Sequence, residues 1–394
     1  MIGISKLYCG TVEPSDALRY GRKSADLPGH LLQFSADKKP VVVWNCTQAC
    51  NLTCIHCYAH AGCRPAPDEL SFDEGRALID DLVTFGVPVL LFSGGEPLCR
   101  ADVPELAAYA VSKGMRAVIS TNGTLITEAV ARRLKGIGLS YVGISLDGLQ
   151  ETNDHFRGQK GAFEKALAGI RACQRVGLKV GLRYTITRHN VNDLPGIFDL
   201  LAAENIPRVC FYHMVYSGRA AAKTDDDLSH AETREALELI IDRTAQLHAV
   251  GRRTEVLTVD NHCDGPYIYL RLLREGREAD AGRVLQLLEM NGGNSSGHGI
   301  GCVSWDGTVY PDQFLRETTL GNVREKPFSS IWSDPHHAVL AALRNKPAHV
   351  TGKCRTCRFL QVCGGNFRAR ALAVTGDFWG VDPACYLSDE EIAP

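Results

Sequence analysis

The sequence of 394 residues lacks long apolar runs, blocks of like charge, internal repeats and low-complexity tracts. No apolar stretch approaches the roughly 20 residues that span a bilayer. The N-terminal stretch MIGISKLYCG is too short and too polar for a secretory signal. The formal net charge is only −2, so nothing in the charge favours nucleic acid or an anionic membrane surface. We therefore expect a cytoplasmic protein without nucleic-acid or membrane partners.

Cysteine is what the sequence has in excess, with 15 residues in an otherwise ordinary globular composition. Most of them gather near the two ends of the chain, at Cys46, Cys50, Cys54, Cys57 and Cys63, and again at Cys354, Cys357, Cys363 and Cys385. In a reducing compartment such groups indicate metal sites rather than disulfides.

Strand and helix patterns alternate through the first half of the chain. Apolar, β-branched runs occur at 41–44, 88–92, 116–120, 140–146, 179–187 and 208–214, with amphipathic helical patterns between them. This alternation predicts parallel strands joined by right-handed crossovers. Six such units are too few for an eight-stranded (β/α) barrel, so we expect an α/β fold built on an open, partial (β/α)6 barrel.

The predicted organisation has four parts. An N-terminal arm occupies 1–39 and the partial barrel 40–215. Bridging helices and a Gly/Ser/Asn-rich linker fill 216–300. A small, loop-rich domain at 301–394 carries the second group of cysteines.

Three cysteines follow the first predicted strand, in the spacing Cys50-x3-Cys54-x2-Cys57. In a parallel barrel the loops after the strands build the active face. A set of only three thiolates leaves one coordination position open, as catalytic metal sites do. The spacing therefore favours a [4Fe–4S] cluster with one iron that the protein does not ligate.

A second motif, FSGGEP, follows the second strand with Gly94, Gly95, Glu96 and Pro97. Two glycines let the backbone approach a ligand closely and expose its N–H and C=O groups. Glu96 adds a carboxylate able to accept from an ammonium group. The alternative is a plain turn with a solvated glutamate.

Together these motifs resemble the radical S-adenosylmethionine (radical SAM) superfamily, whose members share a partial (β/α)6 barrel. The resemblance implies that the three cysteines hold the cluster and that S-adenosylmethionine (AdoMet) binds its fourth iron. It implies that Gly94, Gly95 and Glu96 contact the methionine amine and that Tyr58 lies beside the adenine. Reduction of the cluster by a low-potential donor, flavodoxin or ferredoxin, would split AdoMet. The resulting 5′-deoxyadenosyl radical would take a hydrogen from the substrate.

Polar residues also end the later strands. In the superfamily such positions contact the ribose and the methionine carboxylate, which makes the following residues candidates here: Ser120, Thr121, Asn122, Ser145 and Asp147. Simple helix N-caps are an equal alternative for Thr121 and Asp147. Arg183, near the end of the fifth strand, is a further candidate for the cofactor or for a substrate carboxylate.

The C-terminal cysteines follow the spacing Cys354-x2-Cys357-x5-Cys363-x21-Cys385. Four ligands form a closed set, so a zinc ribbon and a fully ligated [4Fe–4S] cluster both remain open. The spacing resembles the SPASM-type auxiliary domain of radical SAM enzymes, although Phe367 and Asp312 or Gln313 stand where that pattern has cysteines. We therefore expect one auxiliary cluster, and two [4Fe–4S] clusters in all. Cys302 is a candidate fifth ligand, while Cys46, Cys63 and Cys99 are expected to be bystanders.

Several further stretches, among them STNGTLI, GNVREKPFSSIW and TGDFWGVDPACYL, resemble the NirJ family of radical SAM proteins in haem d1 biosynthesis. The resemblance implies an iron tetrapyrrole substrate, 12,18-didecarboxysirohaem, and removal of two propionate side chains. It also suggests a second, paired radical SAM protein as a partner. His213 and Arg219 are candidate substrate contacts, for the iron or the carboxylates.

Three alternatives remain open from the sequence. Related enzymes of the sirohaem-to-haem route remove other carboxyl groups by similar chemistry. Peptide-modifying radical SAM enzymes share the C-terminal domain. A non-catalytic iron–sulfur scaffold is the alternative from another class, and the open three-cysteine site argues against it. For His213, a histidine satisfied within the protein is an equal alternative.

Overall fold

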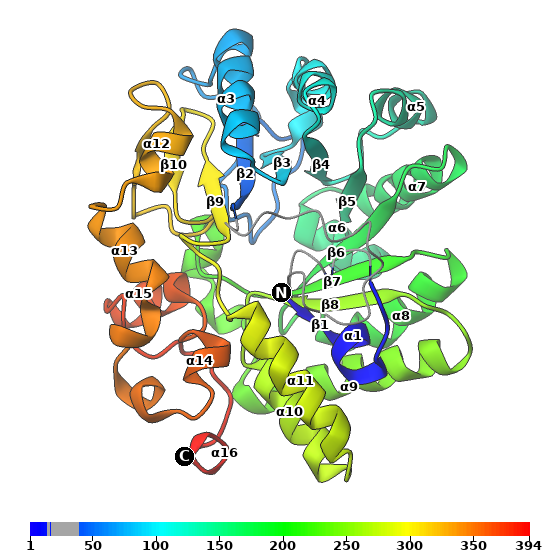
Figure 1. Ribbon diagram of the computed structural model, residues 1–394. Coiled ribbons are helices and arrows are strands. Elements are labelled where there is room, and N and C mark those ends of the chain that lie inside the picture. The colour runs from blue at the N-terminus through cyan, green and yellow to red at the C-terminus, as the bar shows by residue number, and fades with distance from the viewer. Residues whose placement is uncertain (14–15, 17–38) are drawn as a thin grey trace.

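The protein is described by a computed structural model covering residues 1–13, 16 and 39–394. Most of the predicted N-terminal arm, 14–15 and 17–38, lies outside the described residues. Through the described part runs one sheet of eleven strands in the order β1-β8-β7-β6-β5-β4-β3-β2-β9-β10-β11. Figure 1 shows this sheet curving around the interior of the molecule.

All six predicted strands are present and adjacent in the sheet, which confirms the partial parallel barrel. The strands that pair in parallel are β2 (Val41–Thr47), β3 (Val89–Gly94), β4 (Arg116–Thr121), β5 (Tyr141–Ser145), β6 (Val180–Ile186), β7 (Arg208–His213) and β8 (Glu255–Val259). Their residues are mostly buried, as expected for parallel strands covered on both faces.

Helices connect these strands and lie outside the sheet (Figure 1). They are α3 (Phe72–Phe85), α4 (Val103–Ser112), α5 (Glu128–Gly136), α6 (Gln150–Arg157), α7 (Ala162–Arg175), α8 (Leu194–Ala203) and α9 (His230–Ala249). The local sequence sets their ends. Ser71 and Glu74 form a capping box at the start of α3, and Gly86, with φ 85°, ends it.

One strand of the barrel, β8, lies inside the segment that the sequence assigned to bridging helices and a linker. It pairs in parallel with β7, so α9 and β8 add a seventh helix–strand unit. The sequence missed it because the apolar run is short and stands apart from the regular spacing of the first six. Two helices, α10 (Asp264–Arg274) and α11 (Glu278–Asn291), then follow.

The first residues of the chain also belong to the barrel rather than to a separate arm. β1 (Ile2–Gly3) pairs antiparallel with β8, with Ile2 opposite Thr258. The short helix α1 (Ile4–Cys9) packs against α9 and β8. Ile4 is fully buried there, so apolar burial holds this segment in place.

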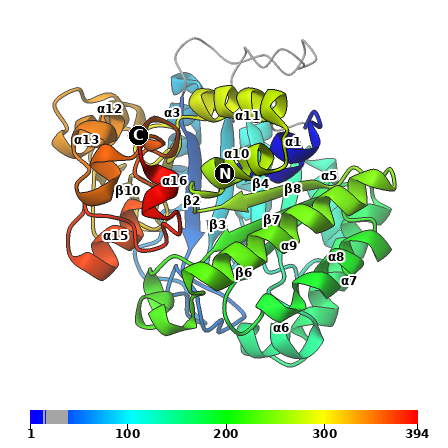
Figure 2. The same cartoon turned by 90° about the horizontal axis from the view of Figure 1, so that it is seen from below.

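At the other edge of the sheet the C-terminal region joins the barrel directly. β9 (Ile300–Val303) pairs in parallel with β2, and β10 (Thr308–Tyr310) and β11 (Gly321–Asn322) continue antiparallel. Short helices and loops complete this region, which lies beside β2 in Figure 2. The helices are α12 (Phe328–Ser333), α13 (Ala338–Arg344), α14 (Leu360–Cys363), α15 (Arg368–Thr375) and α16 (Asp389–Ile392). No helix in the described part of the chain is long and apolar enough to cross a membrane.

Candidate active site

A cavity opens at the carboxyl ends of the parallel strands, and most of the predicted site residues line it. Those lining it are Cys50, Cys54, Cys57, Tyr58, Gly94, Gly95, Ser120, Thr121, Asn122, Ser145, Asp147, Arg183, His213 and Arg219. Glu96 and Pro97 are not among them. The fold therefore brings the ends of six strands together at one face, as the barrel topology requires.

The three-cysteine loop is held by hydrogen bonds from several distant segments. Cys50 N–H donates to the Gly62 carbonyl over 2.7 Å within the loop. Arg219, beyond β7, donates from Nε to the Cys54 carbonyl over 2.8 Å and from its backbone to the Cys57 carbonyl over 3.0 Å. Its neighbour Gly218, with φ 61°, has no room for a Cβ, which would lie 2.4 Å from the Tyr58 carbonyl.

The predicted contact of Arg219 with a substrate carboxylate stays a prediction, because Arg219 lines the cavity but most of its donors serve the loop. Two of its guanidinium nitrogens are bound to loop carbonyls, at Cys54 and Ala61. One nitrogen, Nη2, is buried without a partner. Arg219 therefore positions the cysteine loop, because its guanidinium supplies hydrogen-bond donors to two backbone carbonyls of the loop.

The three cysteines of the loop line one cavity. Nowhere in the described ranges do three His, Cys, Asp or Glu side chains converge closely enough to hold one metal ion. Cys50, Cys54 and Cys57 nonetheless share one cavity, as a larger polynuclear group with open coordination requires. Arg157, at the end of α6, donates from Nη1 to Cys54 Sγ over 3.5 Å. This contact places a guanidinium cation beside one of the three thiols.

Asp147 holds that arginine rather than standing free in the cavity. It forms ion pairs with Arg157 and, at 3.1 Å, with His56. Burial raises the pKa of the Asp147 carboxyl, but Arg157 and His56 outweigh burial and bring it to about 2. It caps no helix, since Leu149 is the N-cap residue of α6. The N-cap alternative is therefore wrong, whereas a contact of Asp147 with the cofactor stays a prediction beside its role in positioning Arg157.

The GGEP motif packs against the cysteine loop through its backbone. Gly95 N–H donates to the Thr47 carbonyl over 2.8 Å, and Glu96 N–H to the Ala49 carbonyl over 2.7 Å. Gly94 has φ 125°, a conformation that side chains rarely adopt. The two glycines therefore let the end of β3 approach the start of the cysteine loop.

Glu96 departs from its predicted role. Its side chain is fully buried and accepts from Thr121 Oγ1 and Asn122 N–H, both over 2.7 Å, and from Leu98 N–H over 3.1 Å. Because these donors occupy the carboxylate, Glu96 ties the end of β3 to the end of β4 and does not face an ammonium group. Pro97 begins the short 3-10 helix Pro97–Cys99 that follows.

Two cavity residues keep groups available for a ligand. Tyr58 is held by hydrogen bonds of its hydroxyl to Asn45 and Ser93, both 3.0 Å, which leave its ring against the cavity. Arg183 stacks over the Tyr212 ring at 4.8 Å. Gly143 on the neighbouring strand leaves room for its stem. Arg183 has no hydrogen-bond acceptor within the described ranges, so its donors can take a ligand carboxylate.

His213, the last residue of β7, also lines the cavity, and one of its ring nitrogens is taken. Nε2 lies 2.9 Å from Asp264 Oδ2, and Asp264 also accepts from the Tyr386 hydroxyl over 2.7 Å. Burial opposes the charged imidazolium, but the Asp264 carboxylate outweighs it and raises the pKa of His213. A histidine anchored in this way is oriented as metal-binding histidines are.

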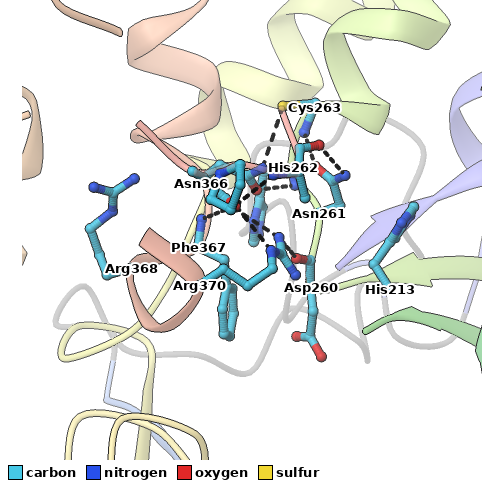
Figure 3. Close-up of polar contacts among 12 residues, drawn as sticks. His213, Asp260, Asn261, His262, Cys263, Asn366, Phe367, Arg368 and Arg370 are labelled. Atoms are coloured by element: carbon cyan, nitrogen blue, oxygen red, sulfur yellow. Dashed lines mark hydrogen bonds and ion pairs between the residues drawn. The ribbon is translucent and has the colours of Figure 1, made fainter. Parts of the chain in front are cut away.

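The C-terminal cysteines gather at a second cavity. It is lined by Cys354, Cys357, Cys363 and Cys385, and also by Cys263 from the loop before α10. Cys263 is buried, accepts from Asn366 Nδ2 over 3.5 Å (Figure 3) and lines the same cavity as Cys363 and Cys385. Sequence reasoning missed it, because nothing local marks a single cysteine between a strand and a helix.

The remaining cysteines lie elsewhere. Cys302, the candidate fifth ligand, is buried in β9 beside Asn45 and does not line the second cavity. Cys46 is buried in β2, and Cys63 and Cys99 are exposed. None of these three lines either cavity.

Iron content tests the ligand sets. With two [4Fe–4S] clusters we expect about eight irons per chain after anaerobic reconstitution. Cys385→Ala should lower the iron content to about four per chain, because it removes one of the four cysteines of the C-terminal motif. Cys263→Ala is the matched control and should keep about eight. A loss of about four irons in Cys263→Ala would instead make Cys263 a ligand, and one zinc per chain would contradict the second cluster.

Comparison with known proteins agrees with this geometry. A model of the radical SAM superfamily matches residues 44–201, and a model of the SPASM iron–sulfur cluster-binding domain matches 298–358. Fe-coproporphyrin III synthase of Methanosarcina barkeri is 63% identical and covers 100% of this chain and 99% of its own. Pre-heme d1 synthase of Dinoroseobacter shibae is 42% identical and covers 90% and 87%.

Among solved structures, native anSMEcpe with bound AdoMet and the Cp18Cys peptide aligns with a TM-score of 0.68. It is 19% identical and covers 90% of this chain and 96% of its own, which supports the shared fold. The two domain types imply AdoMet and two [4Fe–4S] clusters as cofactors. The chain belongs to the radical SAM superfamily, with a partial barrel and a C-terminal SPASM domain.

Proposed function

We propose that this protein is a radical SAM enzyme that forms Fe-coproporphyrin III from 12,18-didecarboxysirohaem. The observation that carries the proposal is the 63% identity to Fe-coproporphyrin III synthase over the whole chain. Among the alternatives from the sequence, this favours an enzyme of the sirohaem-to-haem route over propionate removal in haem d1 synthesis.

The chain's own residues support binding of a carboxylate-rich iron tetrapyrrole. Arg183 presents donors that find no acceptor among the residues the structure describes, and the pKa of His213 is raised at the same cavity. Because His213 Nε2 is bound to Asp264, its other nitrogen, Nδ1, is the one left for a ligand. That nitrogen can contact the tetrapyrrole iron or, in the imidazolium, a carboxylate side chain.

The cofactors supply one step that no side chain here provides, the 5′-deoxyadenosyl radical that takes a hydrogen atom from the substrate. The protein's part is to hold the reacting groups in place. We propose that Cys50, Cys54 and Cys57 ligate the first cluster. AdoMet then lies along the strand ends, against Tyr58, Gly94, Gly95, Ser120, Asn122 and Ser145. The four cysteines of the C-terminal motif, Cys354, Cys357, Cys363 and Cys385, hold the auxiliary cluster.

A second candidate product is the one predicted from the NirJ resemblance. The 42% identity to pre-heme d1 synthase over 90% of the chain supports it. A low-potential flavodoxin or ferredoxin is the proposed electron donor in either case, and a paired radical SAM protein is a proposed partner only for the second.

Product analysis separates the two candidates. The reconstituted enzyme is incubated anaerobically with AdoMet, a reductant and 12,18-didecarboxysirohaem, and the tetrapyrroles are identified by mass and absorption. We expect Fe-coproporphyrin III, which keeps its propionate side chains. A product that has lost propionates would support the haem d1 candidate. An unchanged tetrapyrrole, with AdoMet still cleaved, would contradict both.

A variant of His213 tests the tetrapyrrole site itself. His213→Gln keeps a donor for Asp264 but offers no imidazole to the iron. We expect the absorption shift on binding of 12,18-didecarboxysirohaem to be lost, or the affinity to fall about tenfold or more. His189→Ala is the control, because His189 pairs with Asp226 outside the cavity. An unchanged spectrum and affinity in His213→Gln would leave His213 as a histidine satisfied within the protein.

A further inference from the structure

A buried carboxyl group, that of Asp260, stands at the rim of the cavity directly after β8. The residue lines the cavity and is only 7% exposed. Its Oδ2 has no hydrogen-bond partner. Figure 3 shows the carboxyl group pointing away from the hydrogen-bonded network around Asn366. Burying a carboxyl oxygen without a hydrogen-bond partner destabilises the fold. An unpartnered oxygen at the wall of a cavity therefore indicates that Asp260 faces a ligand.

The backbone of Asp260 is forced into position by the C-terminal domain. Asp260 has φ 66°, a conformation that residues other than glycine rarely adopt. Arg370 on α15 donates to its carbonyl and, over 3.0 Å, to the carbonyl of Met214 beyond β7. Arg370 is itself paired with Asp382 at 2.9 Å, and both side chains are almost fully buried. The Arg370 contact fixes the main chain of Asp260 and leaves its carboxyl group free. Residues held in such unfavourable backbone conformations cluster at functional sites.

The charges that face Asp260 come from four parts of the chain. Burial raises the pKa of its carboxyl to about 6, and Asp312 acts in the same direction. Arg370, the N-terminal amine and His213 act in the opposite direction. Asp260 therefore keeps its proton to higher pH than an ordinary aspartate, and a substrate carboxylate beside it would favour the protonated form further.

We propose that Asp260 is a substrate-contacting residue whose protonated carboxyl group donates a hydrogen bond to a carboxylate side chain of the iron tetrapyrrole. The inference rests on the proposed function and adds a third group to Arg183 and His213. A donor is required because the ring nitrogens of an iron tetrapyrrole bind the metal, and its side-chain carboxylates are acceptors. Arg370 and Asp382 are the positioning residues, since they act on the Asp260 backbone.

The test is binding of 12,18-didecarboxysirohaem to the holoenzyme, followed by absorption between about pH 5 and about pH 8. Wild type is compared with Asp260→Asn, whose amide always donates, and Asp260→Leu, which cannot. All three are compared at equal iron content per chain. At the acidic end we expect Asp260→Asn to bind nearly as wild type and Asp260→Leu about ten- to a hundredfold more weakly.

The pH dependence has a definite sign. The protonated form of Asp260 donates, so its contribution is present below its pKa and is lost as pH rises. His213 also loses its proton as pH rises, and it does so in every variant. The ratio of wild-type to Asp260→Asn affinity therefore isolates Asp260, and this ratio should fall toward alkaline pH. If Asp260→Leu does not fold, this ratio alone decides.

The experiment distinguishes failure of this inference from failure of the proposed function. Wild-type affinity in Asp260→Leu, or a ratio independent of pH, would overturn this inference and leave the proposed function standing. Equal loss in Asp260→Asn and Asp260→Leu would also overturn it, because it would make Asp260 an acceptor. If the wild type bound no iron tetrapyrrole at all, the proposed function would fall and this inference with it.

Discussion

Cys54→Ala is expected to reduce 5′-deoxyadenosine formation to the background rate without enzyme. Within the described part of the chain, three cysteines line the first cavity, so the loss of one leaves two protein ligands for a cluster that also needs an open iron. Cys54 is also the thiol that receives the Arg157 guanidinium, and its carbonyl accepts from Arg219. The substitution therefore removes the thiol that Arg157 contacts while the loop backbone remains held by Arg219.

The measurement is anaerobic turnover of AdoMet with dithionite, together with iron analysis. Iron should fall from about eight to about four per chain, since the second set of cysteines is untouched. Cys63→Ala is the matched control, because Cys63 is exposed and lies in the same loop outside the cavity. Undiminished 5′-deoxyadenosine formation in Cys54→Ala would refute the assignment of the first cluster.

Gly95→Ala is expected to destabilise the fold and to empty the first cluster site together. A Cβ on Gly95 would lie 2.2 Å from the Ala49 carbonyl oxygen and 2.8 Å from that of Gln48. Both are backbone atoms of the cysteine loop, so no side chain can rotate away to relieve the contact. The loop must shift, and with it the hydrogen bond from Glu96 N–H to Ala49.

Overpacking of this kind costs about 1–3 kcal/mol in the free energy of unfolding. Gly62→Ala is the matched control, since Gly62 lies in the same loop and a Cβ there would meet nothing within 4 Å. Its stability should stay within about 0.5 kcal/mol of wild type. Denaturant unfolding and iron content of the two variants check the expectation. Equal behaviour of both variants would show that the close approach at Gly95 is not required.

The fold could be predicted from the sequence where its signals are local and repeated. β-branched runs at regular spacing predicted the six strands β2 to β7, and the cysteine spacing predicted the two groups of thiols. β8 was missed because it is short and stands apart from the regular spacing of the other strands. β1 was missed because it is short and its partner, β8, lies far along the chain, with Ile2 opposite Thr258.

The candidate site shows the same limit. The residues at the strand ends were placed correctly at the cavity, but the partners of Asp147, Glu96 and Arg219 come from other loops. A polar side chain at a strand end either faces a ligand or is bound by its neighbours, and local sequence does not distinguish the two. For the same reason Arg157, Cys263 and Asp260 carried no sequence signal.

The pairing of β1 with β8 has a consequence for biosynthesis. Ile2 and Gly3 lie against Thr258 and Leu257, so β1 has no strand partner until β8, which is synthesised later, has been made. Contacts this distant in sequence form slowly, because a long loop must close first. Completion of the barrel edge must therefore wait until β8 has been synthesised. During that interval chaperones or neighbouring elements must shield the apolar surface of the strands made earlier.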